Sequence, residues 1–138
     1  MKLSTVVYQF LGTYLPHIKG LSNATIKTYR DAFTLFLPFA ANYCSIKINA
    51  LTLDHLSPEL ILAFLQHLEQ KRKNTAKTRN HRLAVIKSLA KMIRLMYPEQ
   101  RHVAENLLRI PKKRMQKKLI GFLYPDEIVK VLNAMPLR

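Results

Sequence analysis

The sequence predicts an all-α fold: a compact bundle of four to five helices, followed by a basic linker and one further short helix. The 138-residue chain holds only three glycines, and the alternation of apolar and polar residues that is typical of strands is scarce. Apolar residues instead recur at steps of three and four over long stretches, which is the period of a helix face. With 49% hydrophobic residues, the chain is long enough for one domain with a buried core.

A glycine stop is expected to separate the first two helices. The first helix should cover residues 4–18 and end at Gly20, because glycine adopts the left-handed conformation without strain. The hydroxyl of Ser22 should cap the second helix, whose apolar side begins at Ile26 and recurs at three- and four-residue steps. Pro38 lies inside that pattern, and since proline has no N–H to donate, the helix should either kink or end there.

A loop and a well-marked helix start follow. Residues 46–53 alternate like a short strand, but a lone strand would have no partner, so a loop hooked onto the core is expected. Ser57, Pro58 and Glu59 combine a capping hydroxyl, a first-turn proline and a first-turn acid. This combination predicts the start of a third helix.

The fourth helix is expected over residues 75–97 and is closed by Pro98, with a short helix near residues 100–108 after it. From Leu83 onward its apolar face is regular. Its front, residues 74–82, is polar at nearly every angle around the axis. These first two turns are therefore expected to project out of the core.

The formal charge of +15 is concentrated in the middle of the chain. Residues 71–118 hold sixteen Lys and Arg against two Asp and Glu, and so carry +14 of the total. Because a one-sign surface repels itself, such a concentration usually meets a polyanion. Nucleic acid is the leading interpretation, and an anionic membrane surface and a merely solubilising face are the alternatives.

Several classes of protein are disfavoured. Cys44 is the single cysteine, so no disulfide can form within the chain, and no cluster of Cys and His has zinc-like spacing. The N-terminus makes a poor signal peptide, and no uncharged apolar run approaches the roughly 20 residues of a membrane span. The sequence therefore predicts a cytoplasmic protein with no metal, cofactor, membrane or small-molecule substrate.

The front of the fourth helix suits DNA for three reasons. Helix N-termini attract phosphate through unpaired N–H groups and the helix dipole. Lysine and arginine release counterions from phosphates, and arginine and asparagine can read base edges in the major groove. A frayed, solvated end is the alternative, and the absence of any Asp or Glu between Lys71 and Met96 argues against it.

Four stretches carry a family resemblance: LSNATIKTYRDAFTLFLPF at 21–39, LSPELILAFLQHLEQKRKNTAKTRNHRLAVIKSLAKMI at 56–93, IPKKRMQKKLIGFL at 110–123 and PDEIVKVL at 125–132. In this order they resemble the core-binding domain of tyrosine recombinases, also called phage integrases. The resemblance implies a SAM-like helical domain over 1–109 that clamps one side of duplex DNA. It also implies a basic interdomain linker over 110–120 and the start of a catalytic domain over 121–138.

The resemblance implies a set of residues that face the DNA, from the first turn of the second helix, the front of the fourth helix and the linker. They are Thr25, Lys27, Thr28, Arg30, Lys73, Asn74, Lys77, Thr78, Arg79, Arg82, Lys112, Lys113, Arg114, Lys117 and Lys118. The family's chemistry needs a tyrosine nucleophile with arginines, a lysine and a histidine in the catalytic domain. Only the opening helix of that domain is expected here, and Tyr124 stands where the family commonly has a capping threonine.

The chain is therefore expected not to be an enzyme on its own. It is expected to be either an experimental fragment or a truncated gene product, derived from a recombinase of a mobile element. Its expected partners are double-stranded DNA and, in a full-length form, other protomers of a synaptic tetramer. Two other hypotheses stay open: a helical adaptor that binds protein through apolar grooves, and a truncated recombinase that occupies a DNA site without cutting. Salt-dependent duplex binding would separate the adaptor from the other two.

Overall fold

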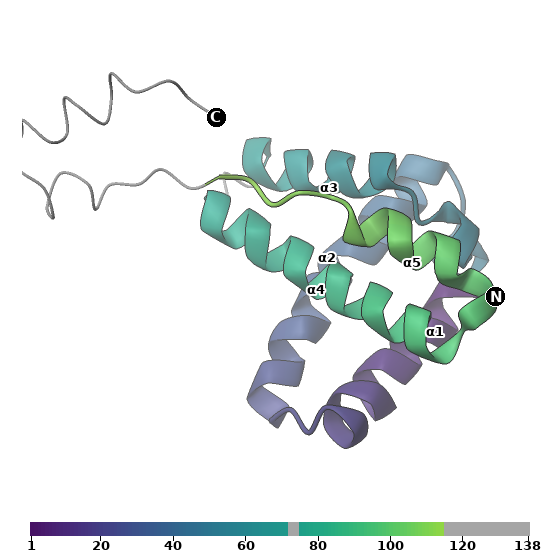
Figure 1. The fold of residues 1–138 in the computed structure, drawn as a ribbon. Helices are drawn as coiled ribbons and strands as arrows, with labels where there is room; N and C mark the ends of the chain where they lie inside the picture. Colours follow the sequence, from purple (N-terminus) through teal and green to yellow (C-terminus); the bar gives the residue numbers. More distant parts are fainter. Residues whose placement is uncertain (72–74, 115–138) are drawn as a thin grey trace, which may run out of the picture.

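The computed structural model describes residues 1–71 and 75–114, and every regular element in those ranges is a helix (Figure 1). In chain order the elements are α1 (Leu3–Gln9), the π-helix η1 (Phe10–Ile18), α2 (Asn23–Cys44), the 3₁₀ turns η2 (Ile48–Ala50) and η3 (Leu53–His55), α3 (Pro58–Gln70), α4 (Ala76–Met96), the 3₁₀ turn η4 (Pro98–Gln100) and α5 (Arg101–Leu108). The predicted all-α bundle is thus confirmed. The further short helix expected after the linker lies outside the described residues.

The first predicted helix has the expected extent, but it changes from an α-helix to a π-helix at Phe10. Its second half, η1, is π-helical and contains Pro16, which cannot donate a backbone hydrogen bond. At its end the N–H of Lys19 donates to the carbonyl of Tyr14, five residues back, at 2.9 Å. Gly20 follows with φ 67°, so the predicted left-handed glycine stop is confirmed.

The second helix begins at the predicted cap and does not end at its internal proline. The Ser22 hydroxyl accepts the N–H of Thr25 at 3.3 Å, and α2 runs through Pro38 to Cys44. Of the two alternatives for Pro38, an end of the helix is therefore wrong. The turns before and after this proline both pack into the core, because Phe36 and Ala40 are fully buried.

Ser45 ends α2 in the left-handed conformation, with φ 58° and ψ 40°. This conformation costs an L-residue roughly 1–2 kcal/mol, because its Cβ crowds the following carbonyl oxygen. Ser45→Gly is therefore expected to raise the free energy of unfolding by about 1 kcal/mol, as measured by urea denaturation. Ser45→Ala keeps the Cβ and is the control, which should leave the stability unchanged; equal stabilities of the glycine and serine proteins would contradict the prediction.

The segment between α2 and α3 is a loop hooked onto the core, as predicted. The N–H of Leu3 donates to the carbonyl of Leu51 at 2.9 Å, and the N–H of Leu53 donates to the carbonyl of Met1 at 3.2 Å. The side chains of Leu51 and Leu53 are buried. The start of the chain is thereby fixed against this loop.

The third helix begins at the predicted serine cap, and the fourth begins at a threonine cap that the sequence had not singled out. The Ser57 hydroxyl accepts the N–H of Leu60 at 3.2 Å, and the Thr75 hydroxyl accepts the N–H of Thr78 at 3.2 Å. In Figure 1, α5 and the segment after it run between α3 and α4, so that the chain leaves the bundle beside the front of α4.

A row of buried phenylalanine rings joins the first three long elements. Phe10 of η1 meets Phe33 of α2 edge-on, with centroids 5.8 Å apart, and Phe36 of α2 meets Phe64 of α3 in the same way at 5.1 Å. All four rings are fully buried. Ile110, which was predicted to begin the linker, belongs to the same core and is 4% exposed.

Candidate nucleic-acid interface

The first turn of α2 presents its predicted residues at the surface. Lys27, Thr28 and Arg30 are exposed, and Thr25 is half-buried. The Thr28 hydroxyl donates to the carbonyl of Ala24 at 3.2 Å, so it is engaged with its own helix. The two cations, Lys27 and Arg30, are the groups of this turn that remain available to an anion.

The front of α4 does not project from the core as a whole, so that expectation is wrong. Lys77 is exposed, but the residue two positions later, Arg79, is only 9% exposed. The reason is tertiary: Arg79 Nε lies 3.1 Å from Oε1 of Glu69, near the end of α3. A long cationic side chain can bury its stem where a carboxylate meets its charged end.

Glu69 joins this helix front to the chain after α5. Its second carboxylate oxygen, Oε2, lies 2.5 Å from Nζ of Lys113. The side chain of Asn80 completes the contact, since its Nδ2 donates to the carbonyl of Lys113 and its Oδ1 accepts the N–H of Lys113, both at 2.7 Å. We call Glu69, Arg79, Asn80 and Lys113 the polar clasp.

Arg82 lies one turn further along α4 and is half-buried. Its Nε and Nη1 are buried and have no hydrogen-bond partner within residues 1–71 and 75–114. Unpaired buried donors are costly. These two donors are shielded from the surface, whereas the half-buried side chain as a whole still reaches it.

A cluster of lysines without acidic partners lies where α4 meets the segment after α5. Burial lowers the pKa of Lys87 first, and repulsion from Lys112 and Lys91 lowers it further. Among the described residues, neither these three lysines nor Lys77 makes an ion pair. A bound anion would relieve the repulsion and return the pKa of Lys87 toward its ordinary value.

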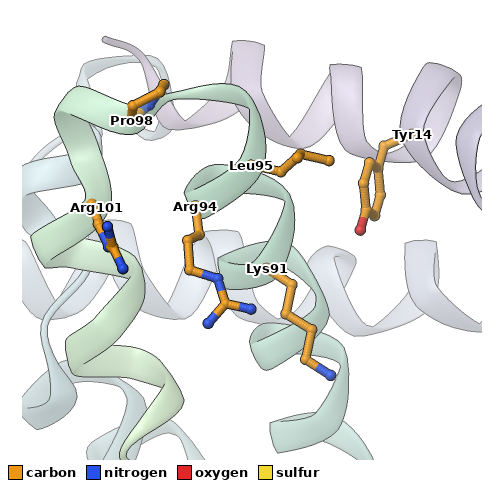
Figure 2. A pocket seen from close by; sticks show the side chains of 6 residues that line it. All are labelled: Tyr14, Lys91, Arg94, Leu95, Pro98 and Arg101. Atoms are coloured by element: carbon orange, nitrogen blue, oxygen red, sulfur yellow. The ribbon is translucent and has the colours of Figure 1, made fainter.

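A second cationic group surrounds an open hollow of about 520 Å³ at the other end of α4 (Figure 2). Its lining residues are Tyr14, Lys91, Arg94, Leu95, Pro98 and Arg101. Glu105 already approaches two of these cations, at 3.9 Å from Arg94 and 3.6 Å from Arg101. Lys91 is the cation that this hollow shares with the lysine cluster.

The structure brings some of the predicted site residues together and leaves others apart. Arg79 and Lys113 meet through Glu69, but no hydrogen bond or ion pair in the described ranges links the first turn of α2 to the front of α4. In Figure 1 the two helix starts lie apart, at the bottom and at the upper left. Lys112, Lys113 and Arg114 are exposed, while Lys73, Asn74, Lys117 and Lys118 lie outside the described residues.

Sequence reasoning missed three residues of this surface. Glu69 and Lys87 were not singled out, and Asn80 was noticed only as part of a polar stretch. A signal for Glu69 existed, because it is the last acidic residue before the long basic stretch. Lys87 could be recognised only once Lys112, 25 positions later in the chain, was placed beside it.

The described part of the chain holds no group of three or more His, Cys, Asp or Glu side chains that could bind a metal ion. It also holds no helix long and apolar enough to cross a membrane.

Comparison with known proteins places the chain in a family. The sequence profile of the family described as "Phage integrase, N-terminal SAM-like domain" matches residues 7–94. The chain belongs to this family. The integrase profile therefore covers the helices from α1 to most of α4, including the front of α4 but not the segment after α5.

Two curated relatives come from Sinorhizobium fredii (strain NBRC 101917 / NGR234). The protein "Putative integrase/recombinase y4rD" is 36% identical to this chain over 132 residues. The protein "Putative integrase/recombinase y4rC" is 30% identical over 132 residues. Both alignments cover 96% of this chain, but they cover only 47% and 40% of the relatives. The chain thus spans less than half the length of these relatives, and no solved structure matches it significantly.

Proposed function

We propose that this integrase-family chain binds double-stranded DNA, as the part of a tyrosine recombinase that clamps one side of the duplex. The observation that carries the proposal is the cluster of Lys87, Lys91 and Lys112, which has no carboxylate partner among the described residues. A protein that lacks a polyanionic ligand gains nothing from holding such charges together. The family membership supports the same conclusion.

The binding surface in this proposal has two parts. The cations of the first turn of α2, Lys27 and Arg30, contact the backbone at one place. The front of α4 and the segment after α5 contact it at another, through Lys77, Lys112 and the neighbouring residues. Thr25, Thr28, Thr78, Arg82, Lys113 and Arg114 belong to the same surface, as do Lys73, Asn74, Lys117 and Lys118, which lie outside the described residues.

Arg79 has a different role in this proposal. Because its guanidinium faces Glu69 and its side chain is 11% exposed, it acts on DNA by holding the front of α4 in place. It is a positioning residue rather than a direct contact. Arg82 is half-buried and makes no ion pair among the described residues, so it is the arginine of this helix that we propose meets a phosphate or a base edge.

The activity of the whole protein is part of the same proposal. The relatives, more than twice as long as this chain, are named as integrases or recombinases. We propose that the full-length protein cuts and rejoins DNA through a covalent phosphotyrosyl link, with other protomers assembled on the same DNA. In that protein, the 138 residues of this chain bind the duplex.

Titration of a fluorescently labelled DNA duplex with the folded chain, followed by anisotropy, tests the proposal. Binding at 50 mM salt that weakens as salt is added is expected, since phosphate contacts release counterions. The absence of binding at 50 mM salt would contradict it. A complex that forms with protein but not with DNA would favour the adaptor hypothesis instead.

A further inference from the structure

The segment that leaves the bundle after α5 is held in place although it has no secondary structure. Residues 111–114 are exposed at every position, and an exposed, charged segment of this kind is ordinarily free to move. Here its first residue follows the buried Ile110, and its third residue is Lys113 of the polar clasp. The clasp therefore holds the segment at a point beyond the core.

Asn80 provides the contact that depends least on charge. A short amide side chain offers a donor and an acceptor side by side, so it can pair with the N–H and the carbonyl of one residue as a neighbouring strand would. Asn80 does this to Lys113, with both distances at 2.7 Å. Its Oδ1 also accepts from Nη1 of Arg79 at 3.2 Å, which fixes the orientation of the amide.

Glu69 adds the charged half of the clasp. One carboxylate oxygen faces Arg79 and the other faces Lys113. The end of α3, the front of α4 and the departing segment are thus joined through one acidic residue inside a strongly basic region. In Figure 1 this segment passes between the end of α3 and the start of α4.

We infer that the polar clasp is a positioning device: Asn80, supported by Glu69 and Arg79, sets the path on which the chain leaves the helical domain. This inference rests on the proposed function in one respect, that the segment's cations contact DNA. Its consequence is that Lys112, Lys113 and Arg114 are already aligned beside the front of α4 before DNA binds. Alignment in advance lowers the cost of ordering these side chains in the complex.

Amide hydrogen exchange in the 138-residue chain tests the clasp without DNA. In the wild-type chain the N–H of Lys113 is expected to exchange about tenfold more slowly than in the Asn80→Ala variant. A factor of this size corresponds to the net free energy of one hydrogen bond. Asn80→Asp keeps the acceptor oxygen but replaces the donor to the carbonyl of Lys113 with a second acceptor, so it should lose part of this protection. Asn106→Ala, at an exposed asparagine of α5, is the matched control and should leave the exchange of Lys113 unchanged.

The same variants then test the link to DNA. Asn80→Ala should bind duplex DNA about three- to tenfold more weakly than Asn106→Ala, because unheld side chains must be ordered on binding. Equal exchange of the Lys113 amide in the wild-type and Asn80→Ala chains would overturn the clasp. If the Lys113 amide exchanges more slowly in the wild-type chain than in Asn80→Ala, but Asn80→Ala and Asn106→Ala bind DNA equally well, the positioning role would be overturned. Failure of the wild-type chain to bind DNA would refute the proposed function, and the exchange result alone would then decide whether the clasp exists.

Discussion

Raising the salt concentration from 50 to 200 mM should weaken the binding of duplex DNA by about a thousandfold. The affinity of a protein that neutralises phosphates falls as a power of the salt concentration, with an exponent of about −0.9 for each phosphate. If about six phosphates are neutralised by cations such as Lys77, Lys87 and Lys112, the exponent is near −5, and a fourfold rise in salt costs about a factor of 10³. Anisotropy titrations of one duplex at five or more salt concentrations give this exponent directly.

The size of the exponent separates the hypotheses for this chain. A shallow exponent, smaller in magnitude than about 2, would mean that phosphate contacts do not dominate the interaction. An adaptor that binds protein through apolar surface would show little dependence on salt. Unfolding measured at each salt concentration is the control, because a loss of folded protein would imitate a loss of affinity.

Phe36→Ala should destabilise the fold by about 3–5 kcal/mol, the usual cost of removing a buried phenylalanine ring. Phe36 is fully buried and lies between two other rings, with centroids 6.4 Å from Phe33 and 5.1 Å from Phe64. The cavity left by its removal would open between α2 and α3, where Phe36 meets Phe64. Denaturation in urea, with the slope checked for two-state behaviour, measures this loss.

Tyr43→Ala is the matched control on the same helix. The Tyr43 ring also contacts another aromatic ring, Phe39 at 6.1 Å, but it is 52% exposed. Its removal should cost about 1 kcal/mol or less, because little apolar surface leaves the core. Similar losses for the two variants would mean that the row of phenylalanine rings is not the centre of the core.

The helix boundaries could be predicted from the sequence because their causes are local. The hydroxyls of Ser22 and Ser57 each cap a helix by accepting the N–H of the residue three positions later in the chain. Gly20 adopts a left-handed conformation that its missing Cβ permits. The residue types alone indicate such features. The same local reasoning left Pro38 undecided, whereas in the structure α2 continues through it with Phe36 and Ala40 buried in the core.

The candidate site was less predictable because its contacts cross the fold. Arg79 was expected to face DNA, yet Glu69 of another helix engages it. The residues of α4 near Arg79 form no apolar face. The sequence of α4 does not show that an ion pair, in place of apolar contacts, attaches this part of the helix to the bundle. Asn80 and Lys113 are likewise separated by 33 positions in the chain. Charge concentration could be predicted, whereas the partners of single charges could not.

The central claim is that DNA meets a defined surface, of which the front of α4 and the segment after α5 form one part. Two double variants with equal net charge test it: Lys77→Gln with Lys112→Gln, and Lys2→Gln with Lys47→Gln. Each lowers the formal charge from +15 to +13, and all four lysines are exposed. In Figure 1 the N-terminus, with Lys2 next to it, lies at the opposite side of the bundle from the departing segment.

Binding isotherms of the two variants on one duplex, over a salt series, are the decisive measurement. The account predicts that the first pair loses about tenfold or more in affinity and that its salt exponent falls in magnitude by about 2, one for each lost phosphate contact. The second pair should lose only the small effect of diffuse charge and keep its exponent. Equal losses in the two variants would contradict the account, because they would show that the positive charge of the chain acts without a defined surface.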